Sequence, residues 1–152
     1  MGKYTVGLGG TFDHLHAGHE KLLQVAFDFG SKVVVGLASD ALLKNKKFKE
    51  NLQTFDERKQ NLIAFAKKIG RAKDLTIIEL DDPLGPAITS PDLDVHVSSE
   101  ETTNVAQQIN EERRKRGLKP LIMVTIPMVL KADGVRYSST EIREQAAKKR
   151  SG

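Results

Sequence analysis

The residues best suited to do chemistry lie in one short stretch, residues 9–19, which reads Gly-Gly-Thr-Phe-Asp-His-Leu-His-Ala-Gly-His. An alternating apolar pattern precedes it and a helical apolar pattern follows, so we expect a turn between a strand and a helix. The free N–H groups and the positive dipole end of such a helix favour an anion, most often a phosphate. Glycines at 9, 10 and 18 would let that phosphate approach the backbone.

His16 and His19 give this stretch its sharpest signal, because both imidazoles can point to the same side of the turn and donate to phosphate oxygens. Two alternatives stay open. One histidine could instead have a capping or packing role, or His14, His16 and His19 could together bind zinc. No acidic motif of the kind found in zinc hydrolases stands nearby.

Two better-known phosphate motifs are absent from the sequence. The Walker pattern Gly-x-x-x-x-Gly-Lys-Ser/Thr does not occur, which argues against a P-loop kinase or GTPase. The dinucleotide pattern Gly-x-Gly-x-x-Gly also fails, because Gly7 and Gly9 are followed by Phe12 where the third glycine would stand. The turn therefore binds phosphate in another way.

Five apolar, β-branched segments alternate with helical patterns along the chain. We expect strands over residues 3–8, 32–37, 75–80, 94–97 and 121–126, and helices over 17–29, from 54 to about 69, 99–116 and from 138 onward. Capping-box spacing opens two of these helices, at Thr54–Glu57 and Ser138–Glu141, and Ser99 is expected to cap a third. Glycines at 30, 70 and 117 are placed to end helices, Gly30 as a residue just past the helix.

This alternation predicts an α/β fold with a doubly wound, five-stranded parallel sheet, formed by one domain over residues 1–152. Ligands of such sheets bind beyond the carboxyl ends of the strands, where the strand order reverses. Residues 9–19, 39–47 and 127–143 should converge there. The second of these stretches is a lysine-rich loop, with lysines at 44, 46, 47 and 49.

Composition narrows the class of protein. The chain has no cysteine, which excludes disulfides, thiolate metal sites and cysteine nucleophiles. No apolar run is long enough to span a bilayer and no leader pattern is seen, so we expect a cytoplasmic protein without a membrane partner. The formal charge is +4, but aromatic residues make up only 5% and tryptophan is absent, which argues against nucleic acid as the partner.

The motifs also carry a resemblance. Gly-Thr-Phe-Asp and His-x-Gly-His at 10–19, together with Ser-Ser-Thr-x-Ile-Arg at 138–143, resemble the HxGH nucleotidyltransferase superfamily, with its Rossmann-like fold. Residues 42–44, 82–87 and 97–102 resemble more narrowly the archaeal and eukaryotic type of phosphopantetheine adenylyltransferase. The similarity covers nearly the whole chain.

The resemblance implies transfer of AMP from ATP to 4′-phosphopantetheine, giving dephospho-coenzyme A and pyrophosphate in coenzyme A biosynthesis. It implies Mg²⁺ as cofactor, carried by the ATP phosphates and not by protein ligands. The nucleophile is already an anionic phosphate, so no general base is needed, and catalysis should consist of positioning and charge stabilisation.

The resemblance also assigns roles to residues. Thr11 would bind the acceptor phosphate, and Lys44 would bridge it to the α-phosphate, although Lys46 and Lys47 could reach the same oxygens. His16 and His19 would stabilise the transferring group. The arm of the acceptor would run near residues 82–87, with Asp82 and Gly85 among its contacts. The expected ATP contacts are Gly9, Gly10, Thr11, Phe12, His16, His19, Arg58, Ser138, Ser139, Thr140 and Arg143.

Some of these assignments have simpler alternatives. Arg58 resembles the arginine of a family Glu-Arg pair but could be an exposed helix cation, and the serine run could be plain N-capping. Asp13 could orient His16 or begin the turn. At the level of the whole protein, the alternatives are a sister enzyme acting on nicotinamide mononucleotide, glycerol phosphate or a flavin, and a non-catalytic nucleotide- or RNA-binding protein.

Overall fold

The computed structural model describes residues 4–43, 52–82, 85–99 and 103–127. Five parallel strands form one sheet in the order β3-β2-β1-β4-β5. The strands are β1 (Tyr4–Gly10), β2 (Gly30–Ala38), β3 (Leu75–Leu80), β4 (Val95–Ser99) and β5 (Ile122–Ile126). The order runs outward from β1 in both directions, which confirms the predicted doubly wound parallel sheet and puts the reversal between β1 and β4.

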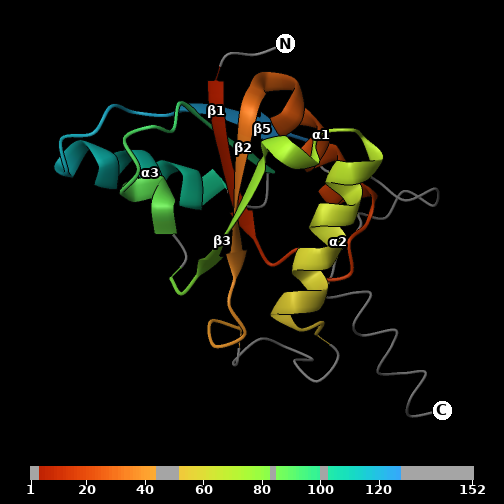
Figure 1. Cartoon of the computed structure of the whole chain (residues 1–152). Coiled ribbons are helices and arrows are strands. Elements are labelled where there is room, and N and C mark those ends of the chain that lie inside the picture. The colour runs from red at the N-terminus through yellow and green to blue at the C-terminus, as the bar shows by residue number, and fades with distance from the viewer. Residues whose placement is uncertain (1–3, 44–51, 83–84, 100–102, 128–152) are drawn as a thin grey trace.

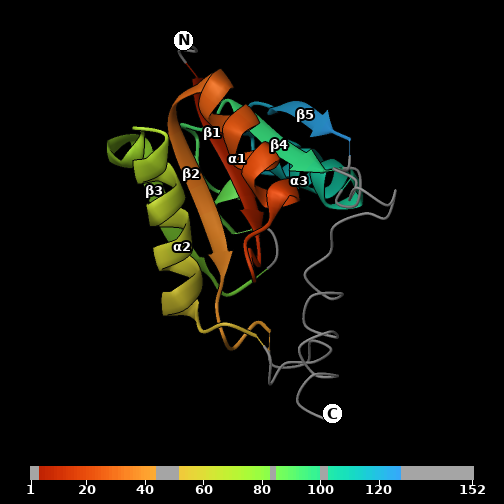
Figure 2. The same cartoon turned by 90° about the vertical axis from the view of Figure 1, so that its right-hand side faces the viewer.

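Helices cover both faces of this sheet (Figures 1 and 2). Helices α1 (Ala17–Phe29) and α2 (Phe55–Lys68) lie on one face, and α3 (Thr103–Lys115) lies on the other. Short 3₁₀ turns, η2 (Ala72–Asp74) and η3 (Gly85–Ile88), flank β3. No helix in the described part of the chain is long and apolar enough to cross a membrane.

The main core lies under α1 and α2. Strand residues that point to that face are fully buried against the apolar stripes of the two helices, as alternation along a strand requires. They include Val6, Leu8, Val33, Val35, Leu37, Val95 and Val97, packed on Leu23, Phe27, Leu62 and Phe65. A smaller core of Leu93, Ile109 and Leu121 lies under α3.

The predicted helix signals at α2 are confirmed. Thr54 accepts a hydrogen bond from the Glu57 N–H at 3.2 Å, and the Glu57 carboxylate accepts one from the Thr54 N–H in return. The helix ends at Lys68 with Ile69 as its C-cap, and Gly70 follows with a φ of +74°, which favours glycine. The Arg71 N–H then closes the end by donating to the Ala66 carbonyl at 2.8 Å.

Two predicted boundaries are wrong. Ser99 does not cap α3, because β4 extends through it and α3 begins at Thr103. Gly30 ends α1 and opens β2 in an extended conformation, with φ −107° and ψ 140°, and not as a left-handed residue just past the helix. A side chain at this position would have its Cβ 2.8 Å from the Lys32 carbonyl oxygen and from Val6, so glycine is needed there for close packing.

Arg71 replaces the missing left-handed cap at the end of α1. Its guanidinium donates to the Phe27 carbonyl at 3.0 Å and to the Gly30 carbonyl at 2.7 Å, and it lies over the Phe27 ring at 5.0 Å. A salt bridge of 2.7 Å to Asp74 fixes the guanidinium. These contacts help the chain to pass directly from helix to strand, because they supply a donor to the Phe27 carbonyl near the helix end.

Candidate active site

The His-x-Gly-His motif folds as the N-terminal cap of α1. His16 is the N-cap, and its Nδ1 accepts a hydrogen bond from the Gly18 N–H at 3.0 Å. His19 occupies the third helical position, and its Nδ1 accepts from the His16 N–H at 3.2 Å. The two rings stack with centroids 3.8 Å apart. Both histidines are therefore part of one capping box, which the sequence allowed for only one of them.

This cap decides which ring nitrogens can act on a substrate. A neutral imidazole whose Nδ1 accepts a hydrogen bond carries its proton on Nε2. Since both Nδ1 atoms accept from backbone N–H groups, Nε2 is the donor atom of each ring. The Gly18 N–H is used by the cap. The nitrogen through which either ring could donate to an anion at this helix end is therefore Nε2.

The turn before the cap has an unusual backbone. Phe12 and His14 have φ values of 49° and 48°, in the left-handed region that residues with side chains rarely adopt. Asp13 between them is fully buried, and its carboxylate accepts from the Gln53 N–H at 2.8 Å. The Gln53 side chain in turn accepts from the His14 N–H at 2.9 Å. The segment before α2 thereby holds this strained turn in place.

Arg58 connects the turn to the end of β2. Its side chain is fully buried, so the alternative of an exposed helix cation is wrong. Nη1 donates to the Thr11 carbonyl at 3.0 Å and to the Ala38 carbonyl at 2.7 Å, and Nε donates to the Gln53 carbonyl at 3.1 Å. A contact of Arg58 with ATP stays a prediction. What the structure shows is a clamp between the turn at Thr11 and the end of β2 at Ala38.

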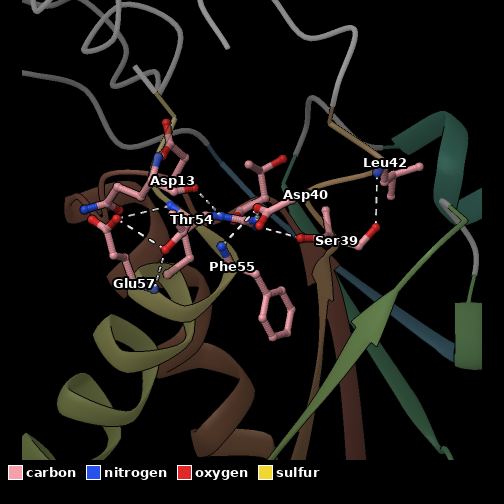
Figure 3. A network of polar contacts seen from close by, with 11 residues as sticks. Asp13, Ser39, Asp40, Leu42, Thr54, Phe55 and Glu57 are labelled. Carbon is pink, nitrogen blue, oxygen red and sulfur yellow. Dashed lines mark hydrogen bonds and ion pairs between the residues drawn. The ribbon is translucent and has the colours of Figure 1, made fainter. Parts of the chain in front are cut away.

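The segment that follows β2 is tied into the same network (Figure 3). The Asp40 carboxylate accepts from Arg58 Nη2 at 2.9 Å and from the Phe55 N–H at 3.0 Å. Ser39 accepts from the Leu42 N–H at 3.1 Å. The chain is thus fixed up to Leu43, immediately before the predicted phosphate ligand Lys44.

Several predicted site residues lie outside the described residues: Lys44, Lys46, Lys47, Ser138, Ser139, Thr140 and Arg143. Asp82 and Gly85 are described and lie shortly after β3. The Gly85 N–H donates to the Asp82 carboxylate at 2.7 Å, and Gly85 has a φ of +45°. Within the described ranges, no group of three or more His, Asp or Glu side chains is arranged to hold a metal ion.

A cavity of about 250 Å³ begins at the turn after β1 and runs along the sheet face that α3 covers. Gly10 and Thr11 line one part of it, and Leu80, Leu93 and Ile109 line another. The glycines of β1 and β2 leave room there, because Gly7, Gly9 and Gly36 line the cavity without side chains. None of the described residues that line it carries a charge. The turn that the sequence predicts to bind phosphate is therefore continuous with an uncharged, mostly apolar cavity.

Two polar side chains in this cavity were missed by the sequence analysis. His96 and Ser98 lie on β4 with exposed fractions of 7% and 3%. Both line the cavity, and neither the His96 Nδ1 nor the Ser98 hydroxyl has a hydrogen-bond partner among the described residues. Burial lowers the pKa of His96 to about 4, so its ring is neutral at pH 7. The only sequence signal was their alternation with Val95 and Val97.

Arg113 of α3 was also missed. It is fully buried, and burial lowers the pKa of its guanidinium. Nη1 donates to the carbonyls of Ala87 and Ser90, both at 2.8 Å, and Nε donates to the Lys119 carbonyl at 2.8 Å. Since Ala87 lines the cavity, Arg113 fixes part of its wall.

Comparison with known proteins places these features in context. Residues 8–145 match the family model described as cytidylyltransferase-like. The phosphopantetheine adenylyltransferase of Methanopyrus kandleri is 41% identical over 138 residues, which cover 91% of this chain and 87% of that protein. The protein of the same name from Pyrobaculum aerophilum is 41% identical over 138 residues, covering 91% of this chain and 88% of that protein.

A solved structure is similar as well. It is a protein of unknown function from Archaeoglobus fulgidus, with a TM-score of 0.73 and 25% sequence identity. The match covers 88% of this chain and 99% of that chain. The similarity therefore extends over the whole α/β unit and is not limited to the histidine motif.

Proposed function

The chain belongs to the cytidylyltransferase-like family and, within it, to the phosphopantetheine adenylyltransferases, and from this we propose that it transfers AMP from ATP to 4′-phosphopantetheine. The products are dephospho-coenzyme A and pyrophosphate, which makes the chain a nucleotidyltransferase of coenzyme A biosynthesis. We place this reaction in the cytoplasm.

The observation that carries the choice of acceptor is the continuity between the phosphate turn and the uncharged cavity. 4′-Phosphopantetheine has an anionic phosphate at one end and a long neutral arm at the other. Its phosphate suits Thr11 at the turn, and its arm suits the channel along β4. Nicotinamide mononucleotide would place a cationic ring, and glycerol phosphate a short hydroxylated chain, where the described lining residues are mostly apolar.

The proposed reaction is an in-line displacement at the α-phosphorus of ATP. An oxygen of the acceptor phosphate donates an electron pair to form the new P–O bond. The bond from the α-phosphorus to the bridging oxygen breaks, and its electron pair leaves with pyrophosphate. No proton has to be removed from the nucleophile, so the histidines need only donate hydrogen bonds to the charge that develops.

The remaining predicted ligands complete this scheme. We propose that Lys44, or its neighbours Lys46 and Lys47, bridges the acceptor phosphate and the α-phosphate, and that Ser138, Ser139, Thr140 and Arg143 hold the outer phosphates. Mg²⁺ would neutralise charge on the ATP phosphates.

The experiment is a pyrophosphate-release assay with ATP, Mg²⁺ and one acceptor at a time. We expect release with 4′-phosphopantetheine and little with nicotinamide mononucleotide or glycerol 3-phosphate. Release with only another acceptor would contradict the substrate assignment while leaving the nucleotidyltransferase reaction. No release with any acceptor would contradict both.

A further inference from the structure

The cavity beside β4 contains a feature that the reaction scheme leaves unused. His96 and Ser98 point to the same sheet face, because they stand two residues apart on one strand. Each is more than nine-tenths buried, and each has a polar atom without a partner in the described part of the chain. An unpaired buried polar atom costs about 1–3 kcal/mol, so two of them in one cavity indicate that a polar ligand group belongs there.

The chemistry of the pair specifies what that group is. A neutral imidazole offers one donor and one acceptor, and a hydroxyl can do both. No charged side chain lines the cavity among the described residues, so an ionic partner would lack a counter-charge. A neutral amide, with one N–H and one carbonyl, matches both residues. The walls beside them, Leu80, Ala87, Leu93 and Ile109, suit the methylene groups between amides.

The spacing agrees with an arm that carries two amides. A strand advances about 3.3 Å per residue, so the two side chains leave the sheet about 7 Å apart. The two amides of a pantetheine arm are separated by two methylene groups, and one amide could lie beside each residue. The cavity also connects to Gly10 and Thr11, where the phosphate of the same molecule would bind.

We propose that His96 and Ser98 form an amide-recognition pair that determines the specificity of the acceptor site for the pantetheine arm. This inference rests on the proposed function, since it assigns the tail of the same substrate. Arg113 acts on this site as a positioning residue, because it holds the carbonyls of Ala87 and Ser90 and thereby the opposite wall.

The test uses His96→Leu and Ser98→Ala in the chain of 152 residues. His96→Gln is the conservative variant, because its amide again offers a donor and an acceptor, and Ser31→Ala is the matched serine control on the exposed start of β2. Two quantities are measured: the dissociation constant of 4′-phosphopantetheine by calorimetry without ATP, and the steady-state constants of pyrophosphate release. ATP affinity is measured in parallel as a check of folding.

We expect His96→Leu and Ser98→Ala each to weaken acceptor binding by roughly 5- to 20-fold, in the dissociation constant and in KM alike, as loss of a hydrogen bond to a buried amide predicts. The kcat and ATP affinity should stay within twofold. His96→Gln should recover most of the loss, and Ser31→Ala should have no effect. 4′-Phosphopantothenate lacks the second amide. In at least one of the two variants, its affinity relative to the wild type should therefore fall by a smaller factor than that of 4′-phosphopantetheine.

The outcomes separate this inference from the proposed function. If the wild-type chain does not use 4′-phosphopantetheine, the proposed function fails. If the wild-type chain uses 4′-phosphopantetheine but both variants bind it as tightly as the wild type does, the proposed function stands and the amide-recognition pair is refuted. His96 and Ser98 would then only bind water or pack against their neighbours. Should His96→Leu fail to fold, Ser98→Ala and His96→Gln decide the question, because both substitutions preserve the size of the site more closely.

Discussion

At the scale of the residue, the two motif histidines serve the backbone and the substrate with different atoms. Their Nδ1 atoms complete the helix cap, with distances of 3.0 and 3.2 Å, and their Nε2–H groups are the donors proposed to act on the transferring phosphoryl group. Replacing His19 with alanine would remove both functions at once. Loss of activity in that variant would not distinguish a capping role from a catalytic one.

Amide substitutions separate the two functions of His19. In His19→Asn the side-chain oxygen lies near the position of Nδ1 and can preserve the cap, whereas in His19→Gln the amide nitrogen lies near the position of Nε2. We expect His19→Asn to lower kcat by roughly 10²–10³-fold with ATP affinity nearly unchanged, as removal of a transition-state donor should. His19→Gln should retain more activity and lose stability, by about 1 kcal/mol, with the cap.

Urea unfolding and steady-state kinetics of both variants decide this point. If His19→Asn binds ATP much more weakly but keeps its kcat, then His19 binds ATP in the ground state and does not stabilise the transition state. A kinetic loss that follows the stability loss, larger in His19→Gln than in His19→Asn, would reduce the histidine to its capping role.

His96 gives a second prediction at this scale, concerning pH. Burial lowers the pKa of His96 from 6.5 to about 4 in the folded protein. Between these values the unfolded chain binds a proton that the folded chain does not, so stability must fall as pH falls through this range. Well above pH 6.5 the ring is neutral in both states and contributes no pH dependence. The expected loss is about 2 kcal/mol at pH 5 relative to pH 7.

The measurement is the free energy of unfolding at pH 7 and pH 5 for the wild type and for His96→Gln, which does not titrate. The variant should lose about 2 kcal/mol less than the wild type over this interval. Equal losses in the two proteins would mean that His96 is protonated in the fold near its ordinary pKa, and would weaken its role as a neutral partner for amides.

At the scale of the element, Arg58 shows how helix α2 positions a turn to which it contributes no motif residue. Its guanidinium joins the helix to the Thr11 and Ala38 carbonyls, at the ends of β1 and β2. We expect Arg58→Met to destabilise the fold by about 2–4 kcal/mol, because buried carbonyls lose their donors. Lys59→Met is the matched control, since it removes the neighbouring charge from a less buried position and should change stability by less than about 0.5 kcal/mol.

Denaturant unfolding measures this effect, and ATP binding measured on the same variant tests the other interpretation of Arg58. A variant with unchanged stability and weakened ATP binding would show that Arg58 acts as a nucleotide ligand. A less stable variant that still binds ATP once folded would assign it to positioning alone.

The same scale shows what the sequence could predict. The capping box at Thr54–Glu57 and the glycine after the end of α2, Gly70, were predictable, because these signals act within a few residues. The alternation of β4 predicts only that His96 and Ser98 share a face. That face is buried because α3 and η3 cover it, and this depends on the order of the sheet. The burial of Arg58 likewise depends on carbonyls that lie 20 and 47 residues away in sequence.

At the scale of the whole molecule, the doubly wound sheet brings the phosphate turn after β1 and the polar pair on β4 to the same place. These two strands are neighbours at the point where the strand order reverses. The periodicity of the segments was enough to predict this sheet. Of the predicted convergence of residues 9–19, 39–47 and 127–143, the described residues show the part between 9–19 and 39–43. It did not predict the cavity, because the channel exists only where glycines of β1 and β2 meet the covered side of β4.

A site built across the reversal point couples acceptor binding to the stability of the whole fold. A ligand that binds only the folded state stabilises it by RT ln(1 + [L]/Kd), which is about 2.7 kcal/mol at 100 times Kd. For a chain of 152 residues that corresponds to a rise in Tm of roughly 5–11 °C. We expect 4′-phosphopantetheine to produce this shift without ATP, because in the proposed binding mode its phosphate and its arm would contact both halves of the sheet.

Thermal unfolding with 4′-phosphopantetheine, nicotinamide mononucleotide and inorganic phosphate, each at the same concentration, tests this coupling independently of catalysis. Inorganic phosphate would occupy only the turn in this binding mode and should give a much smaller shift than the full acceptor. The part of the shift that depends on the arm should shrink in Ser98→Ala, because the amide-recognition pair is incomplete there. Equal shifts for phosphate and for 4′-phosphopantetheine would mean that binding is confined to the turn and that the cavity beside β4 does not hold the arm.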